Sequence, residues 1–373
     1  MANAVLFLTL KVFSATGGIE KVCRVAGKAL NEIQVAEGGK FRVMSMYESS
    51  QDAAGNKYFP AEKFKGFNKR KSRFIFAAIK AGMYSDVIIL SHINLLLAGW
   101  LIKKIRPSKK LILLAHGIEV WEPFSAWKKI MLNTCNEIIS VSNFTSASVQ
   151  EQLKNTQIKF SVVNNCLDPF LPPPTAAKKN PALLKKYSIG ANDPVLLTLT
   201  RLSATERVKG YHTVMGIVAQ LKKKYPSIRY LLAGKADAAE RKFLEQLICT
   251  LHLEENVILT GYVADDELAE YFQLADLYVM PSKKEGFGII FIEAMFYGLP
   301  VIAGNKDGSA DALLNGELGL LVNPDDVDEI KNAIEKMLGN SAHHKPDPQK
   351  LMQHFSFETY KENFKKALNS IKN

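Results

Sequence analysis

Cysteines are few in this sequence, and no two of them have the spacing of a zinc site or a redox dithiol. The chain of 373 residues contains four, at Cys23, Cys135, Cys166 and Cys249. They lie far apart and form no C-x-x-C pair, which argues against a zinc site and against thiol redox chemistry. Unpaired cysteines are typical of a reducing compartment, so we expect a cytoplasmic protein.

Long apolar segments are also lacking. The longest apolar stretch is V-I-I-L-S-H-I-N-L-L-L-A-G-W-L-I, residues 87–102, and it contains His92 and Asn94. This stretch is shorter than the roughly 20 apolar residues that a membrane-spanning helix needs. We interpret it as a buried strand followed by a helix. The N-terminal run A-V-L-F-L-T-L has no basic segment before it, so we expect no targeting segment.

Acidic residues are scarce in one part of a basic chain. The formal net charge is +11, and residues 57–80 hold eight Lys or Arg, interleaved with aromatic residues, against Glu62 alone. This segment is either a solvated basic face, a surface for anionic lipid or phosphate, or a nucleic-acid surface. We expect no nucleic-acid partner, because no RNA- or DNA-binding motif accompanies the charge. An anionic membrane surface stays open as a partner of residues 57–80.

Short, continuous apolar runs recur along the chain, as in parallel strands that are buried on both faces. The runs are residues 4–10, 42–47, 87–91, 111–115 and 138–142, then 194–200, 229–233, 256–260, 277–280 and 300–303. Helix-like stretches alternate with them, which predicts two doubly wound α/β domains. A proline-rich segment between the two sets predicts a linker at residues 171–193. Ligands bind at the carboxyl ends of such strands, so the expected site is a cleft between the domains.

The segment E-G-F-G-I-I-F-I-E-A-M-F-Y-G-L-P, residues 285–300, places one carboxylate inside an apolar helix. Between its second and third glycines, eight of nine residues are apolar or aromatic, and the ninth is Glu293. A buried charge is costly without a partner. Its partner is either a buried cation or a ligand. A glycine-rich helix start suits phosphate, and a carboxylate further along suits ribose hydroxyls. Glu285 precedes the glycines, where it could hold a sugar beyond the phosphates.

Cations for a diphosphate follow the strand P-V-L-L-T-L-T. The segment R-L-S-A-T-E-R-V-K-G, residues 201–210, contains Arg201, Arg207 and Lys209. Arg suits bidentate recognition of phosphate oxygens, and Lys acts as a point charge. The alternative is that these are ordinary loop charges on a basic protein. No third glycine stands at position 291 and no G-x-x-x-x-G-K-[ST] loop exists, so the dinucleotide fingerprint and the P-loop are both excluded.

These residues resemble the retaining glycosyltransferases of family 4, which have the two-domain GT-B fold. The similarity is strongest in S-K-K-E-G-F-G-I-I-F-I-E-A-M-F-Y-G-L-P-V-I, where the family carries two glutamates around Gly-Phe-Gly. It extends through R-L-S…K-G, L-L-A-G, V-I-L-T-G-Y-V and A-D-L-Y-V-M-P-S in the second half. In the first half, T-G-G-I-E, A-H-G, S-V-S and V-V-N-N-C-L-D occur in the family's order. The resemblance covers nearly the whole chain.

The resemblance implies an α/β fold of the GT-B class, with two doubly wound parallel-sheet domains facing across a cleft. Residues 1–170 would form the acceptor-side domain, to which a final helix at 355–373 returns. Residues 194–354 would form the domain that binds the nucleotide-sugar donor. The resemblance implies no cofactor and no metal, and the acidic D-V-D at 326–328 is interpreted as a helix cap.

For the second domain, the resemblance implies a role for each of the residues already described. Glu293 would bind the donor ribose, and Arg201 and Lys209 would neutralise the leaving diphosphate. The gap between this Arg and Lys is eight positions, where five is usual in the family, so Arg207 is a rival to Lys209. The donor sugar and diphosphate would be held by Glu285 with the amides of Gly286, Phe287 and Gly288. The base would meet the backbone of Gly261, Tyr262 and Val263.

In the first domain, Gly17 and Gly18 would bring a loop against the phosphates, and His116 would contact the transferred sugar. His116 follows the strand L-I-L-L-A, and the alternative is a strand-end histidine bonded to nearby backbone. His92 also follows a strand, and there we favour that structural role.

The expected function is therefore retaining transfer of a hexosyl group from a UDP- or GDP-linked sugar. The expected acceptor is a glycan or a lipid-linked saccharide in cell-surface polysaccharide synthesis, at the inner face of the membrane. The alternatives are a nucleotide-sugar epimerase of the same architecture and a non-catalytic nucleotide-sugar-binding protein.

Overall fold

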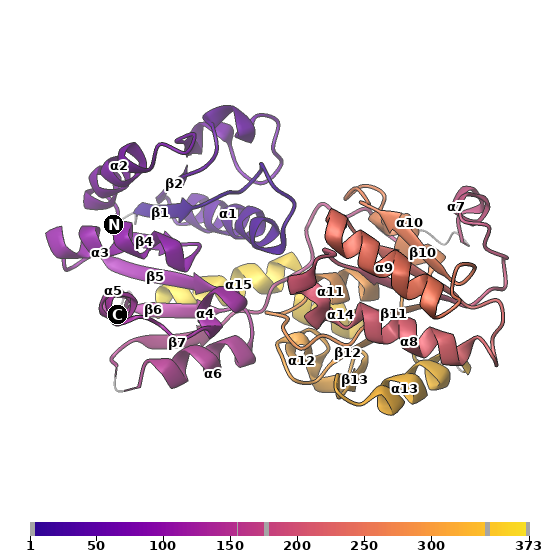
Figure 1. Ribbon diagram of the computed structural model, residues 1–373. Helices are drawn as coiled ribbons and strands as arrows, with labels where there is room; N and C mark the ends of the chain where they lie inside the picture. The colour runs from indigo at the N-terminus through magenta and orange to yellow at the C-terminus, as the bar shows by residue number, and fades with distance from the viewer. Residues whose placement is uncertain (1–3, 155, 175–178, 340–343, 371–373) are drawn as a thin grey trace. The chain divides into compact units, whose positions relative to one another are not determined.

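The computed structural model describes residues 4–154, 156–174, 179–339 and 344–370, and the chain divides into two compact units (Figure 1). The first unit comprises residues 1–169 and 354–373, and the second comprises residues 170–353. Within the described residues, no helix is both long enough and apolar enough to cross a membrane.

The first unit is built on a parallel sheet of seven strands in the order β3-β2-β1-β4-β5-β6-β7. The strands are β1 (Ala4–Thr9), β2 (Lys40–Ser45), β3 (Phe64–Gly66), β4 (Val87–Leu90), β5 (Lys110–Ala115), β6 (Glu137–Ser140) and β7 (Lys159–Val162). Short 3-10 helices are η1 (Ser50–Ala53), η2 (Ala61–Lys63) and η3 (Ile93–Leu95). The central strands are apolar throughout because helices cover both faces of the sheet.

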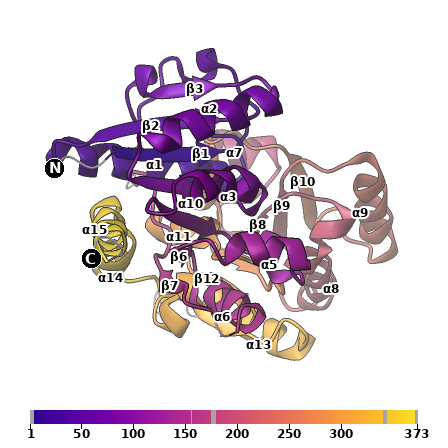
Figure 2. The same cartoon turned by 90° about the vertical axis from the view of Figure 1, so that its left-hand side faces the viewer.

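Two layers of helices enclose that sheet (Figures 1 and 2). One face packs against α1 (Gly18–Ala36) and α15 (Phe357–Asn369), which contact each other. The other packs against α2 (Lys71–Met83), α3 (Leu96–Ile105), α5 (Ala126–Leu132) and α6 (Asn143–Gln152). A one-turn helix, α4 (Ile118–Trp121), follows β5. The last helix of the chain thus belongs to the core of the first unit.

The second unit has a parallel sheet of six strands in the order β10-β9-β8-β11-β12-β13. The strands are β8 (Val195–Leu199), β9 (Arg229–Ala233), β10 (Val257–Gly261), β11 (Leu277–Met280), β12 (Val301–Gly304) and β13 (Leu320–Val322). The helices are α7 (Pro181–Lys186), η4 (Ala204–Lys209), α8 (Tyr211–Leu221), α9 (Ala238–Thr250), α10 (Leu268–Leu274), α11 (Ile289–Phe296), α12 (Ser309–Ala312), η5 (Leu314–Gly316), α13 (Val327–Gly339) and α14 (Pro348–Phe355).

The predicted pair of parallel-sheet α/β domains is confirmed, and each predicted apolar run forms a strand. Three strands were missed, namely β3, β7 and β13. All three are edge strands of three or four residues, and most of their side chains are partly exposed, so the sequence shows at most a very short apolar run there.

The predicted linker at residues 171–193 is more structured than expected. Its C-terminal part forms α7, capped by the Asn180 side chain, and Leu183 is buried. Lys179 pairs with Asp276 of the second unit at 2.7 Å. Part of the segment, residues 175–178, lies outside the described residues, as do residues 371–373 of the predicted final helix. The described part of the segment therefore belongs to the second unit.

Candidate functional site

The strand order of the second unit reverses at β8. From β8 the sheet runs through β9 and β10 on one side, and through β11, β12 and β13 on the other. In open parallel sheets, ligands bind where the order reverses, outside the carboxyl ends of the strands. Here the switch point lies between β8 and β11. The loops that leave these two strands contain Lys209 and the segment from Glu285 to Gly288.

Lys209 and Glu285 meet at this switch point. Nζ of Lys209 lies 2.7 Å from Oε2 of Glu285 and 2.7 Å from the carbonyl oxygen of Lys284. The amide of Lys283 donates a 2.9 Å hydrogen bond to the carbonyl of Val208, which ties the two loops together. Lys209 is only 7% exposed. A cation and a carboxylate are thus fixed side by side at the carboxyl ends of two neighbouring strands.

The glycine loop leads directly into α11. Gly288 has φ +87°, and a Cβ there would lie 2.3 Å from a ring carbon of the buried Phe291, so only glycine fits. The first amides of a helix have no intrahelical partner and favour anions. Glu293 lies in this short helix and is 1% exposed. The helix therefore offers amide donors at its start and holds a buried carboxylate one turn further on.

Asp307 belongs to the same constellation, and sequence reasoning missed it. Its Oδ2 accepts a 2.7 Å hydrogen bond from the amide of Glu285, and its Oδ1 accepts one of 2.9 Å from the amide of Ser309. The amide of Gly308 donates in turn to the carbonyl of Glu285 at 2.8 Å. Burial raises the pKa of the Asp307 carboxyl to about 6. Asp307 thereby fixes the backbone that carries Glu285. The sequence feature that could have revealed Asp307 is the Asp-Gly pair just after the strand V-I-A-G.

The two arginines near Lys209 lie in other surroundings. Arg201 is 81% exposed along its side chain and pairs with Glu206 at 2.5 Å. Arg207 is bound through Nε and Nη2 to the buried Glu240, at 2.8 to 3.0 Å. Its guanidinium carbon also lies 3.5 Å from the ring centroid of Phe243. Of the two rivals, Lys209 is therefore the cation beside the glycine loop.

The segment predicted to meet the base lies at the end of β10, the edge strand two places from β8. Gly261 has φ +76°, and its carbonyl accepts a 2.9 Å hydrogen bond from the amide of Gly234. Tyr262 is exposed and Val263 is buried. These residues share the carboxyl edge of the sheet with Lys209 and Glu285, but β9 lies between them.

In the first unit, the strand order reverses at β1, between β1 and β4. Gly17 and Gly18 follow β1, and Gly17 is the N-cap of α1. The loop before them is anchored by Glu48, which sequence reasoning also missed. Its carboxylate accepts hydrogen bonds from the amides of Val12, Phe13 and Ser14 and from the Ser45 hydroxyl, at 2.6 to 2.8 Å. Glu48 is 1% exposed, and a carboxylate with four such donors is well satisfied.

His116 directly follows β5, the strand next to β4 in the sheet. One of its ring nitrogens, Nε2, lies 2.7 Å from the carbonyl oxygen of Ser91, and its amide donates to Glu119 at 2.5 Å. This backbone contact is the one expected if His116 were structural. His92 accepts from the amide of Asn94 through Nδ1 and caps η3, which matches the structural role favoured for it. Among the described residues, no group of three or more His, Cys, Asp or Glu side chains is placed to hold a metal ion.

Solved GT-B proteins share this two-unit fold. HepE of Anabaena, solved with UDP, superimposes with a TM-score of 0.80 at 21% identity, over 98% of this chain and 100% of that one. Sucrose-phosphate synthase of Thermosynechococcus elongatus gives a TM-score of 0.78 at 21% identity, over 99% of each chain. At this identity the likeness establishes the fold, and the GT-B class is confirmed.

Sequence comparison relates the second unit to known glycosyltransferases. Residues 180–355 match the family described as "Glycosyl transferases group 1". GDP-mannose-dependent alpha-(1-6)-phosphatidylinositol monomannoside mannosyltransferase of Mycobacterium tuberculosis is 31% identical over 46% of this chain and 44% of its own length. The 2-deoxystreptamine N-acetyl-D-glucosaminyltransferase of Niallia circulans is 26% identical over 66% of this chain and 64% of its own. The matches thus span between 44% and 64% of these relatives. The chain has the GT-B fold, and its second unit carries a domain of the group 1 glycosyltransferase type.

Proposed function

We propose that this protein is a retaining glycosyltransferase, which moves a hexosyl group from a UDP- or GDP-linked sugar to a glycan or lipid-linked saccharide. The observation that carries the proposal is the pairing of Lys209 with Glu285 at the switch point, beside a glycine-opened helix that buries Glu293. The family match over residues 180–355 supports it. So do the named activities of the curated relatives, which are glycosyl transfers.

In this proposal, each group acts on charge that develops as the bond from sugar to diphosphate breaks. Negative charge grows on the diphosphate, where Lys209, Arg201 and the amides of Gly286, Phe287 and Gly288 stabilise it. Glu293 accepts hydrogen bonds from the ribose, and Glu285 holds the donor sugar. The acceptor attacks from the face that the diphosphate leaves, which preserves the anomeric configuration.

The remaining assignments follow the same scheme. The backbone of Gly261, Tyr262 and Val263 meets the base, Gly17 and Gly18 bring the loop after β1 to the phosphates, and His116 contacts the transferred sugar. We propose that no metal is needed, because lysine, arginine and amide donors supply the positive charge. The protein would act in the cytoplasm on cell-surface polysaccharide precursors, at the inner face of the membrane.

The test is to incubate the protein with UDP- and GDP-hexoses, with and without lipid-linked saccharide acceptors, and to analyse products by NMR. The expected result is an acceptor-dependent product whose new linkage keeps the donor's anomeric configuration. Conversion of the donor without an acceptor would identify an epimerase instead. Binding of the nucleotide sugar with no product from any acceptor would identify a non-catalytic binder. An inverted linkage would overturn the retaining mechanism.

A further inference from the structure

Three neighbouring helices of the first unit, α2, α3 and α5, share an unusual composition. Their sequences are K-S-R-F-I-F-A-A-I-K-A-G-M, L-L-A-G-W-L-I-K-K-I and A-W-K-K-I-M-L, and none contains an aspartate or a glutamate. All three cover the same face of the sheet, and α3 packs against both of the others. They therefore form one continuous outer surface, which we call the acid-free face. Figure 2 shows these helices together on the side turned toward the viewer.

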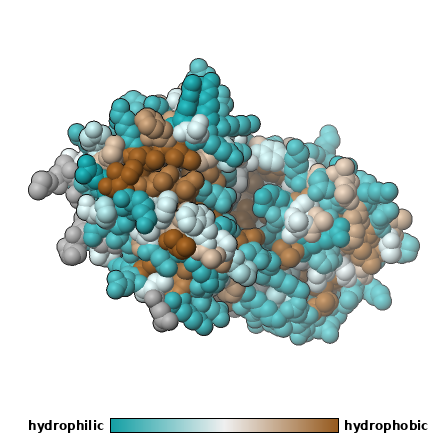
Figure 3. Space-filling view, turned by 60° about the vertical axis from the view of Figure 1, so that its left-hand side comes forward, coloured by the Kyte–Doolittle hydropathy of each residue, from teal (hydrophilic) through white to brown (hydrophobic). Residues whose placement is uncertain are grey.

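This face carries large apolar side chains as well as cations. Phe76 on α2 is 73% exposed, Ile105 on α3 is 50% exposed and Trp127 on α5 is 51% exposed, and Leu97 and Ile130 add to them. Trp127 packs edge-on against Trp100 of α3, with ring centroids 5.3 Å apart. Scattered exposed apolar residues are ordinary, but a contiguous group on adjacent helices marks an interaction site. Figure 3 shows an apolar area on the first unit, on the side where these helices lie.

The helix α3 accounts for much of this surface because it is apolar on two sides. Its inner side buries Leu96, Ala98, Gly99 and Ile102 against the sheet. Its outer side carries Leu97 and Ile105, with Trp100 and Leu101 half-buried between them. A helix that packs on one side only would normally present polar residues on the other. The outer stripe of α3 therefore has the composition of a surface that is covered by something apolar.

Exposed cations lie on the same three helices as these apolar side chains. Lys80 on α2, Lys104 on α3 and Lys129 on α5 are exposed, as are Lys71 and Arg73 at the start of α2. Nζ of Lys104 lies 5.5 Å from the ring centroid of Trp100. The first acidic residue after α2 is Asp86, which faces Lys109 at 3.6 Å. A positive rim around exposed tryptophan, phenylalanine and isoleucine is complementary to a surface that is anionic outside and apolar beneath.

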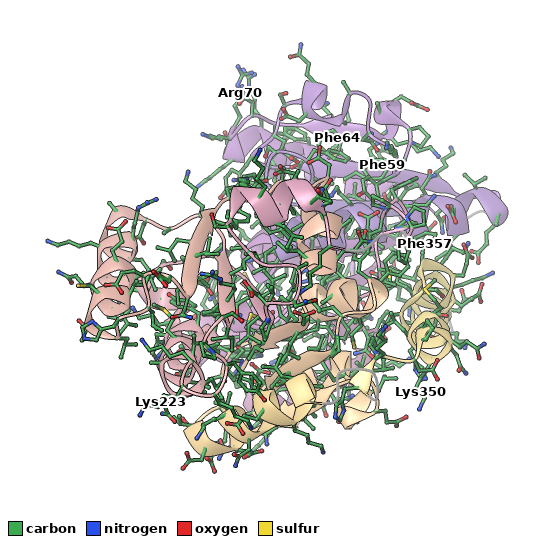
Figure 4. All side chains as sticks on the ribbon, turned by 90° about the vertical axis from the view of Figure 1, so that its right-hand side faces the viewer. Phe59, Phe64, Arg70, Lys223, Lys350 and Phe357 are labelled. Carbon is green, nitrogen blue, oxygen red and sulfur yellow. The ribbon has the colours of Figure 1, made fainter. Side chains whose placement is uncertain are left out.

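Residues 57–80, which the sequence offered as a membrane surface, supply only part of the acid-free face. Four aromatic side chains of that segment, Phe59, Phe64, Phe67 and Phe74, are buried in the two core clusters, so their interleaving with cations reflects packing, whereas Phe76 is exposed. Figure 4 shows Phe59 and Phe64 within the unit and Arg70 reaching outward from it. The cations of this segment contribute to the rim, whereas the apolar contact comes mainly from further along the chain.

We propose that the acid-free face docks on an anionic lipid membrane, with Phe76, Leu97, Ile105, Trp127 and Ile130 in the headgroup region and the surrounding cations against lipid phosphates. This deepens the proposed function and rests on it, since a lipid-linked saccharide acceptor is reached at a membrane surface. The docking itself needs neither donor nor acceptor, so its test is independent of transfer activity.

The three tryptophans of the chain, Trp100, Trp121 and Trp127, all lie in α3, α4 and α5. Intrinsic tryptophan fluorescence therefore reports on this part of the first unit alone. We expect vesicles of phosphatidylcholine with 30% phosphatidylglycerol to blue-shift the emission, and brominated lipids to quench it. Vesicles of phosphatidylcholine alone should bind at least tenfold more weakly, and added salt should weaken binding to the anionic vesicles.

Two triple variants separate the apolar from the electrostatic part. Phe76→Ser with Ile105→Ser and Trp127→Ser, and separately Lys80→Gln with Lys104→Gln and Lys129→Gln, should each lower partitioning in a sedimentation assay at least tenfold. A matched charge control is Lys40→Gln with Lys223→Gln and Lys366→Gln, at three exposed positions outside α2, α3 and α5. Val35→Ser, on α1 and so on the opposite face of the same sheet, is the apolar control. Both controls should partition like the wild type.

Several outcomes would overturn the docking proposal. These are no binding to anionic vesicles, equal binding to both kinds of vesicle, or triple variants that bind like the wild type. A wild type that self-associates through this face, with dimerisation lost in the apolar variant and vesicle binding unchanged, would show that a second copy of the chain covers it. Nucleoside diphosphate binding by each variant confirms folding. A loss of vesicle binding with diphosphate binding intact separates this proposal from the proposed function.

Discussion

Nζ of Lys209 lies 2.7 Å from Oε2 of Glu285, although the two residues come from loops after different strands of the second sheet. The pair is partly buried, and the loops that carry it are joined by the backbone bond from Lys283 to Val208. A lysine held in this way needs little rearrangement to face a diphosphate. Preorganised charge of this kind is the main means by which enzymes stabilise a leaving anion.

Lys209→Ala should lower kcat of sugar transfer by about 10²- to 10³-fold, because loss of one preorganised donor to a developing charge has that effect. Initial rates with a saturating nucleotide sugar measure it.

Arg207→Ala is the matched control for that variant. Arg207 holds Glu240 rather than the glycine loop, so its loss should leave kcat within a few-fold of the wild type. It should instead lower the free energy of unfolding by about 1–3 kcal/mol. Breaking a fully buried ion pair costs about 3–5 kcal/mol, and the loss is smaller here because Arg207 is part-exposed. A large loss of kcat in Arg207→Ala with none in Lys209→Ala would reverse the two assignments.

Glu48 should act as a positioning residue for the loop that leads to Gly17 and Gly18. In Glu48→Gln an amide group replaces one acceptor oxygen and faces a donor, either a backbone amide or the Ser45 hydroxyl. We expect the free energy of unfolding to fall by about 1–3 kcal/mol, the cost of leaving a buried donor unsatisfied. Chemical denaturation measures this loss.

The control for Glu48 is Ser45→Ala, which removes a single contact with its carboxylate and leaves the three backbone amides bonded. It should be milder in its effect on stability and should leave the affinity for the donor unchanged. Glu48→Gln should also raise KM for the donor. Equal KM values in both variants would show that the loop has no part in binding.

Asp307 should make stability depend on pH in a particular direction. Its folded-state pKa is raised from 3.8 to about 6, so the folded protein holds a proton that the unfolded chain releases. The stabilisation is therefore complete below pH 3.8 and is lost as pH rises through 6. The advantage of the wild type over Asp307→Asn, measured by denaturation, should shrink by about 2–3 kcal/mol between pH 4 and pH 7. A pH-independent difference would contradict this.

The sequence predicted the central strands of both sheets because burial on both faces leaves a continuous apolar run, as in β1, β5 and β8. It did not predict β3, β7 or β13, whose side chains are mostly part-exposed. It also placed a linker where α7 packs on the second unit. Short segments with one buried side chain carry too weak a pattern to be recognised.

The residues of the candidate site also differ in how clearly the sequence reveals them. Residues in a strongly patterned segment, such as Glu293 in its apolar helix, stand out in the amino-acid sequence itself. Asp307 and Glu48 do not, because their importance lies in the distant backbone amides they accept from. Arg207 and Lys209 are equivalent in sequence, and their different partners far along the chain, Glu240 and Glu285, separate them. Contacts between loops are set by the topology of the sheet, which spacing along the chain does not encode.

The proposed donor site is tested most directly by the thermal midpoint of the wild type and of Glu293→Gln with UDP and with GDP. A ligand at about a hundred times its Kd adds roughly 2.7 kcal/mol of stability, which is about 5–10 °C for a unit of this size. We predict that one of the two diphosphates raises the midpoint of the wild type by this amount and that of Glu293→Gln by much less. If neither raises it, or if both proteins respond equally, Glu293 is a structural carboxylate and the proposed donor site is wrong.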